Sequence, residues 1–280
     1  MKGSVLKSLF SALGGLTAAA AVGAAMGTWG LMAERDLLYV LGPVRITVSG
    51  IGAALSLLTL IAFAYKWFRW KQKRTSEESG MAVSLLDGFG FGLLPSIAIW
   101  KCFEHYTRLG KGTVLMEGFP ALPLVTEKGE FQPAMLETLM ALVLFAAIIF
   151  WLMVRKKELP AIGDLAGVSL TLWCAVRLIT EGVRIAQPGI GGLPPVMGWL
   201  AAAGMLICLI IWMTRAIRTH QHPGYILACP LVWLGSIALI VLIRNQIILF
   251  DHPVAKMVII LCSALLAMKA VLCMGRISRA

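Results

Sequence analysis

Apolar runs of helix length, separated by short charged segments, limit the folds open to this chain. A helix crosses the hydrocarbon core of a bilayer in roughly 20 residues. Eight runs reach or approach that length, at 8–33, 46–65, 84–100, 138–154, 165–176 extended toward Glu181, 193–214, 225–243 and 254–271. Because a backbone in lipid must satisfy its own hydrogen bonds, these runs predict helices. We therefore expect an all-α, polytopic integral membrane protein with about eight transmembrane helices.

The charged residues support this class of protein. Only 14% of the residues are charged, whereas soluble domains carry roughly 25%. The formal net charge is +11, but the basic residues gather at the ends of the apolar runs, where they anchor topology and meet anionic lipid head groups. No basic patch with interleaved aromatic residues lies elsewhere, so we predict no nucleic-acid partner.

The same basic residues predict the orientation in the membrane. They precede the first run and follow the second, fourth, sixth and eighth; they are Lys2, Lys7, Lys66, Arg69, Lys71, Lys73, Arg74, Arg155, Lys156, Lys157, Arg215, Arg218, Arg276 and Arg279. The positive-inside rule then places both termini in the cytoplasm. Segments 34–45, 101–137, 177–192 and 244–253 face outward, and the longest of them is either a functional loop or a solvated connector.

Residues 1–27 allow a second interpretation. Lys2 and Lys7, an apolar stretch and small residues at 21–26 also resemble a secretory signal peptide. We interpret the segment as an uncleaved span because its apolar run is longer than a usual signal core. Cleavage would leave the rest of the topology unchanged.

Cysteine and histidine spacing gives no sign of a metal site. The six cysteines include no C-x-x-C pair, and most lie inside apolar runs as small core residues would. His220 and His222 are two residues apart and do not share a helix face. We therefore predict no metal and no cofactor.

The stretch 165–184 carries the strongest functional signal. Its apolar run leads directly into Arg177, Glu181 and Arg184, and a helix stacks residues with this spacing on one face. Charges at the end of an apolar span are costly unless they are paired or hydrated, so they indicate a functional site. The alternative is an Arg177–Glu181 ion pair that only anchors the helix end.

This stretch resembles the penultimate span of prolipoprotein diacylglyceryl transferase, the bacterial enzyme that lipidates the lipobox cysteine. The family helix opens with Gly-x-Leu and ends in Arg-x-x-x-Glu-x-x-Arg, a pattern filled here by Gly163, Leu165, Arg177, Glu181 and Arg184. Further pieces agree in order: Leu41-Gly42-Pro43-Val44-Arg45-Ile46 with Gly50, Leu85-Leu86-Asp87, Phe131-Gln132-Pro133-Ala134-Met135-Leu136-Glu137, and the run from Gly191 to Leu209. The piece that ends at Glu137 resembles the family motif His-Pro-Thr-Gln-Leu-Tyr-Glu, with several residues of the motif replaced.

The resemblance covers roughly residues 38–218 and implies a division of the chain. That part would be a transferase-like membrane core with the outer loop 101–137. Residues 1–37 would be an extra N-terminal span or signal-like segment, and residues 219–280 would be two additional C-terminal spans.

The chain also departs from the family. The signature Gly-Arg-x-Gly-(Asn/Cys)-Phe falls on Trp100-Lys101-Cys102-Phe103-Glu104-His105, so Lys101 replaces the arginine and Glu104 replaces Asn or Cys. Between the second run and Leu85, a block with two spans and the family's His-Gly-Gly element is missing.

The resemblance implies roles for the outer charges. A diacylglyceryl group would move from phosphatidylglycerol to a peptide thiol, and an anionic phosphoglycerol would leave. Arg177, Arg184 and Arg45 would bind the lipid phosphate, because a guanidinium forks onto phosphate; Arg45 is otherwise a marker of the membrane boundary. Glu181 would orient Arg177 or accept the thiol proton.

For each of three further residues, the sequence leaves two possible roles open. Lys101 would add a second positive charge to the catalytic site, or it snorkels to the interface as an isolated lysine does. His105 would replace the missing histidine as a base, or it is a solvated loop residue. Asp87 is expected to cap its own helix or to pair with the basic loop before it.

Our leading hypothesis is therefore a lipid-modifying transferase of the bacterial inner membrane, with an outward-facing basic site built from the second, third and fifth runs. Its expected partners are phosphatidylglycerol and a prolipoprotein signal segment. The alternative is a non-catalytic descendant that keeps the phospholipid or lipoprotein site. A small-solute transporter is less favoured because the charges crowd at span ends instead of mid-membrane.

Overall fold

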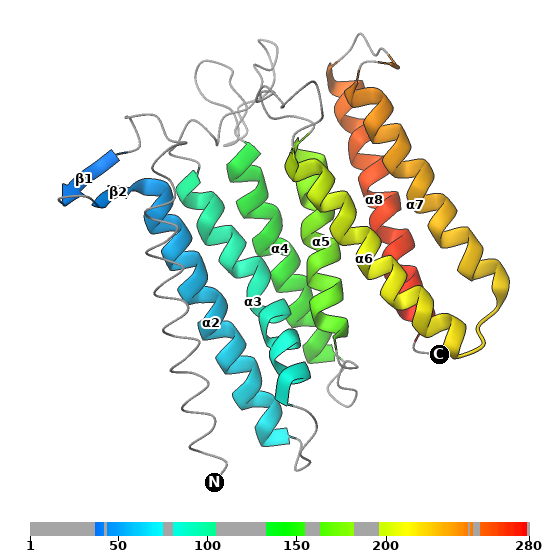
Figure 1. The fold of residues 1–280 in the computed structure, drawn as a ribbon, viewed down its shortest axis with the longest axis horizontal. Coiled ribbons are helices and arrows are strands. Elements are labelled where there is room, and N and C mark those ends of the chain that lie inside the picture. Colours follow the sequence, from blue (N-terminus) through cyan, green and yellow to red (C-terminus); the bar gives the residue numbers. More distant parts are fainter. Residues whose placement is uncertain are drawn as a thin grey trace.

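The computed structural model describes residues 37–41, 44–74, 81–104, 133–154, 163–181, 196–245, 247–248 and 253–278. This part of the chain forms a short β-hairpin and seven helices, which run alternately up and down (Figure 1). The elements are β1 Leu37–Leu41, β2 Val44–Thr47, α2 Val48–Arg74, α3 Met81–Glu104, α4 Pro133–Val154, α5 Asp164–Glu181, α6 Val196–Arg218, α7 Pro223–Arg244 and α8 Pro253–Ile277.

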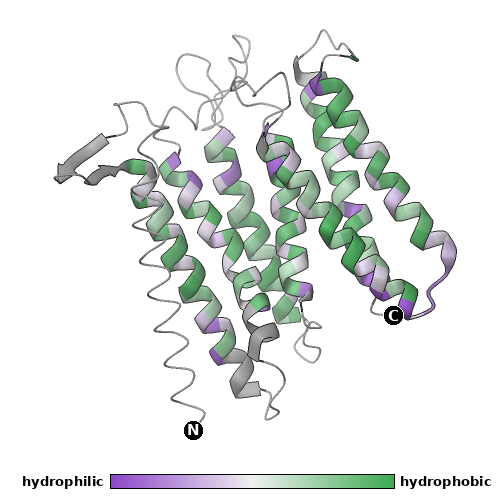
Figure 2. Ribbon diagram, in the orientation of Figure 1, coloured by the Kyte–Doolittle hydropathy of each residue, from purple (hydrophilic) through white to green (hydrophobic). Residues whose placement is uncertain are grey.

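The helices coincide with the apolar runs, so the prediction of an all-helical bundle is confirmed. Among the described residues, five helices are long and apolar enough to cross a membrane, over Gly50–Arg69, Pro133–Val154, Met197–Arg218, Pro223–Arg244 and Ala255–Ile277. Figure 2 shows apolar residues along the middle of the helices and hydrophilic residues mainly near their ends. This is the composition of a multi-pass membrane protein. The predicted first span, 8–33, lies outside the described residues.

The boundaries of three predicted outer segments were wrong, and one of these segments, 177–192, begins inside α5, which continues to Glu181. Residues 37–41 and 44–47 form two antiparallel strands that pair Leu41 with Val44 and Val40 with Arg45, so the helix begins at Val48 and not near residue 46. The β-branched sequence of β2 favours a strand locally. The segment 101–137 is helical at both ends, because α3 continues to Glu104 and α4 begins at Pro133.

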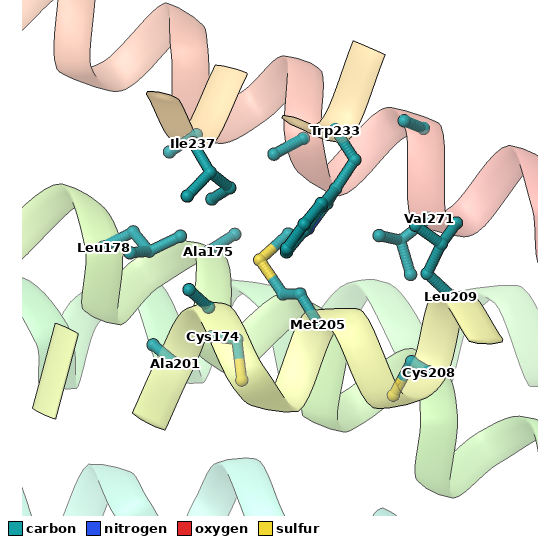
Figure 3. Packing of buried hydrophobic residues seen from close by; sticks show 14 of the residues in the cluster. Cys174, Ala175, Leu178, Ala201, Met205, Cys208, Leu209, Trp233, Ile237 and Val271 are labelled. Carbon is teal, nitrogen blue, oxygen red and sulfur yellow. The ribbon is translucent and has the colours of Figure 1, made fainter. Parts of the chain in front are cut away.

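Helix α5 is the central column of the bundle. It packs against α3, α4, α6 and α8, and 13 of its 18 residues are buried. One apolar core joins it to the last three helices, and Figure 3 shows Met205 of α6 and Trp233 of α7 pointing toward one another beside Cys174 and Ala175 of α5. A second core, around Trp67, Leu94, Ile148, Leu165 and Leu172, joins it to α2, α3 and α4.

Alternating glycines let α3 approach its neighbours closely. A Cβ on Gly90 would lie 2.4 Å from Cα of Ala166 in α5. A Cβ on Gly92, on the other side of the helix, would lie 2.7 Å from the carbonyl oxygen of Leu60 in α2. These contacts are with backbone, so a side chain at either position would force the helices apart.

A carboxylate of α3 fixes the start of α5. Both oxygens of Asp87 accept the N–H of Gly163, at 3.0 and 3.1 Å, and Gly163 has a φ of +85°, which favours glycine. Asp87 lies well inside α3, so the expectation that it caps its own helix was wrong; it caps the N-terminus of α5, where the dipole favours an anion. Asp164 beside it pairs with Arg215 of α6 at 3.2 Å.

Candidate functional site

Six charged side chains meet at one end of the bundle, and we call this group the ion cluster. It lies where α3, α5 and α7 end and α4 and α6 begin, which is the upper end in Figure 1. Its members are Lys101 and Glu104 of α3, Glu137 of α4, Arg177 and Glu181 of α5, and Arg244 of α7.

Glu137 is the centre of the ion cluster. Its side chain is fully buried and lies between two cations, with carboxylate oxygens 2.9 Å from Nη1 of Arg177 and 3.3 Å from Nζ of Lys101. The hydroxyl of Thr180 donates to the same carboxylate at 2.5 Å. One residue of α4 therefore ties α3 to α5.

Each of the two buried cations has a second carboxylate on its own helix. Nη2 of Arg177 lies 2.7 Å from Glu181, one turn further along α5. Lys101 forms an ion pair with Glu104 and also lies over the ring of Trp100, 4.9 Å from its centroid. Nε of Arg177 makes no hydrogen bond to any described residue, which leaves one buried donor for a ligand.

Arg244 brings α7 into the ion cluster. Its Nη2 lies 3.5 Å from the carboxylate of Glu181 and donates to the main-chain carbonyl of the same residue at 3.2 Å. Glu181 is the last residue of α5, so this carbonyl has no partner within the helix. A cation at a helix C-terminus is favourable for that reason and because of the helix dipole.

The described members of the ion cluster balance one another in formal charge. Three cations, Lys101, Arg177 and Arg244, face three carboxylates. Buried ions at this depth are stable only because they compensate one another, so removal of one member leaves an opposite charge unpaired.

The structure brings together three of the predicted site residues. Arg177, Glu181 and Lys101 are all members of the ion cluster. The interfacial role considered for Lys101 was wrong, because its side chain is only 4% exposed and paired with carboxylates. Arg45 lies in β2 opposite Val40, whereas His105 and Arg184 lie outside the described residues.

Sequence reasoning missed the partners of these residues. Glu137, Glu104, Thr180 and Arg244 were not assigned to the site. Glu137 left a usable signal, because it is the only charged residue in the 22 residues of α4. Arg244 left a weaker one, as the single charge that ends α7.

No family model, curated protein or solved structure matches this chain. The site must therefore be judged by its chemistry. Within the described residues, no group of three or more His, Cys, Asp or Glu side chains could hold a metal ion. The guanidinium and ammonium groups can bind a phosphate, and a carboxylate between them can hold or accept a proton.

Proposed function

We propose that this chain is a lipid-modifying membrane transferase that resembles phosphatidylglycerol–prolipoprotein diacylglyceryl transferase and binds a phospholipid head group at the ion cluster. One observation carries the proposal. Residues from three separate segments that resemble the family meet in one contact network. They are Lys101 at the signature position, Glu137 at the end of the segment 131–137, and Arg177 with Glu181 in the segment that resembles the penultimate span. Buried charges have to pair in any case, so the support for the proposal is that the paired residues are those of the resembling segments.

The chemistry suits an anionic leaving group. The thiol of the acceptor forms a bond to the glyceryl carbon, the bond from that carbon to the phosphate oxygen breaks, and glycerol phosphate leaves with the electron pair. Arg177 would hold the phosphate and offset its charge, with its free Nε as an additional donor. Glu181 would accept the thiol proton or orient Arg177, which it contacts at 2.7 Å.

The location is part of the same proposal. The end of the bundle with the ion cluster would face outward in the bacterial inner membrane, with about eight spans and both termini in the cytoplasm. The positive-inside rule supports this, since the clusters of basic residues in the sequence fall at the opposite helix ends. A thiol would then arrive from water and a lipid from the outer leaflet.

A non-catalytic descendant that only binds phospholipid or lipoprotein is the second candidate. The charge balance favours it, because Arg177 already contacts two carboxylates and a substrate phosphate would have to compete with them. The lysine at the signature position also favours it, since an ammonium cannot replace the fork of a guanidinium.

A transfer assay in lipid nanodiscs separates the two candidates. Purified protein is given phosphatidylglycerol and a lipobox-cysteine peptide, and peptide mass is read for a diacylglyceryl addition. Arg177→Lys keeps the positive charge but loses the two parallel hydrogen bonds of the guanidinium. Arg218→Gln is the matched control, because it removes an exposed arginine at the other end of α6. We expect addition by the wild type and the control and at least a tenfold loss for Arg177→Lys, about the value of one charge-assisted hydrogen bond. Lipid binding without any addition would refute the transferase and support the second candidate.

A further inference from the structure

Arg244 is the cation of the ion cluster that is most open to an approaching ligand. Its side chain is 17% exposed, compared with 10% for Arg177 and 4% for Lys101. It is also the most loosely held of the three, because its contact with the Glu181 carboxylate is 3.5 Å long whereas that of Arg177 is 2.7 Å.

A glycine of α6 makes room for this side chain. Nη1 of Arg244 lies 2.7 Å from the position that a Cβ on Gly198 would occupy, and the Cγ of Glu181 lies 3.6 Å from the same point. The guanidinium therefore passes directly over the backbone of α6 to reach the end of α5. Any larger residue at position 198 would push it away.

Arg244 also lies outside the part of the chain that resembles the transferase family, which ends near residue 218. Its place in the ion cluster is therefore a property of this chain and its last two helices. Phosphate and carboxylate groups can both accept two parallel hydrogen bonds from a guanidinium. A lipid phosphate and Glu181 would therefore compete for the same donors.

We propose that Arg244 binds the phosphate of an anionic phospholipid by exchanging Glu181 for it, which makes α7 part of the binding site. The inference rests on the proposed function and names a further binding residue for it. Counted over its six described members, the ion cluster is neutral before the lipid arrives, and a phosphodiester brings one negative charge. The phosphate takes the place of the Glu181 carboxylate at Arg244 and Arg177. The displaced carboxylate, on the last residue of α5, turns toward water at the helix end, so that no anion stays buried without a counter-charge.

The exchange predicts effects of opposite sign at the two partners. Glu181→Gln removes the competing anion, so we expect phosphatidylglycerol to bind roughly tenfold more tightly. Arg244→Gln removes a donor, so we expect binding to weaken about tenfold, the value of one charge-assisted hydrogen bond. In the double variant Glu181→Gln with Arg244→Gln, the increase in phosphatidylglycerol affinity should be smaller. Only the donors of Arg177 that Glu181 releases should contribute to it. Arg218→Gln is the matched control and should bind as the wild type does.

The measurement is a titration of the purified protein with phosphatidylglycerol in mixed micelles, read by native mass spectrometry with phosphatidylcholine as the neutral competitor. Weaker binding by Glu181→Gln would overturn the exchange, because a purely structural Glu181 predicts that sign. Wild-type binding by Arg244→Gln, in a protein that loses phosphatidylglycerol on Arg177→Gln, would overturn this inference and leave the proposed function intact. No preference for phosphatidylglycerol in the wild type would overturn both.

A second variant keeps the inference testable if Arg244→Gln does not fold. Arg244→Lys preserves the positive charge beside Glu181 but loses the fork. We expect it to bind phosphatidylglycerol more weakly than the wild type. Unchanged affinity for Arg244→Lys would show that Arg244 acts as a point charge only and would refute its role as a two-pronged phosphate ligand.

Discussion

Loss of the Glu137 carboxylate should destabilise the bundle more than loss of any lipid-facing side chain. Glu137→Gln keeps the size of the side chain and removes its charge. The glutamine oxygen can still accept from Thr180, but Arg177 at 2.9 Å and Lys101 at 3.3 Å then face a neutral group. Each hydrogen bond to a charged group contributes about 1.5–3 kcal/mol.

The expected magnitude follows from what the two cations keep. Arg177 retains Glu181 and Lys101 retains Glu104, so neither becomes a lone buried ion. We therefore expect a loss of about 3 kcal/mol in the free energy of unfolding, at the lower end of the 3–5 kcal/mol typical of a broken buried ion pair. Glu137→Ala adds a cavity and should cost about 1–2 kcal/mol more.

Unfolding of the purified protein by sodium dodecyl sulfate in mixed micelles, followed by circular dichroism, measures these values. Val143→Ala is the matched control, because it lies on the same helix with its side chain exposed and should change stability by less than about 0.5 kcal/mol. A double-mutant cycle with Lys101→Met and Glu137→Met should show a coupling of about 2 kcal/mol. A Glu137→Gln variant as stable as the control, or additive effects in the cycle, would refute the claim that the ion cluster is mutually compensated.

Three further predictions test other contacts. Gly90→Ala should destabilise by about 2 kcal/mol or more because the new Cβ meets the backbone of α5, whereas Gly235→Ala, with open space around it, should be neutral or stabilising in the same denaturation assay. Asp87→Asn should lower the free energy of unfolding by about 1–2 kcal/mol, since it weakens the cap of α5; an unchanged transition midpoint would contradict the capping role. Gly198→Ala should displace the guanidinium of Arg244 at a small cost of about 1 kcal/mol, and a double-mutant cycle of Arg244 with Glu181 should then show no coupling; persistent coupling would argue against the crossing over α6.

The helices could be predicted because each one carries its own signal. Seven of the eight apolar runs fall in the described part of the chain, and each coincides with one of its seven helices. The run that begins at residue 165 and was extended toward Glu181 became α5, Asp164–Glu181. Helix α2 continues past its apolar run through Lys66 and Arg69 to Arg74, because long basic side chains can leave the membrane region while their backbone stays helical. The β-hairpin was not predicted, since short strands depend on pairing and not on the length of an apolar run.

The ion cluster could be predicted only where its contacts are local. The Arg177–Glu181 pair follows from spacing along one helix, and it was found. The contacts of Glu137 with α3 and α5, and of Arg244 with α5, join residues about 36 to 63 positions apart, and no periodicity records which helices will be neighbours. The burial of Lys101 was missed for the same reason, because its carboxylate partner on α4 is not visible along its own helix.

The position of α5 explains why this bundle can hold so many buried charges. A charged helix in lipid is stable only if its charged face meets other protein, and α5 is enclosed by α3, α4, α6 and α8. Its apolar core is completed by Trp233 and Ile237 of α7 and Val271 of α8, so the last two helices share the packing of the helix that carries Arg177. Helix α7 also supplies Arg244 to the C-terminal end of α5. The packing of α5 by the last helices and the contact of Arg244 with its end have one physical origin. A helix that is surrounded by protein can keep ions at its end only if a neighbouring helix also supplies the counter-charge there.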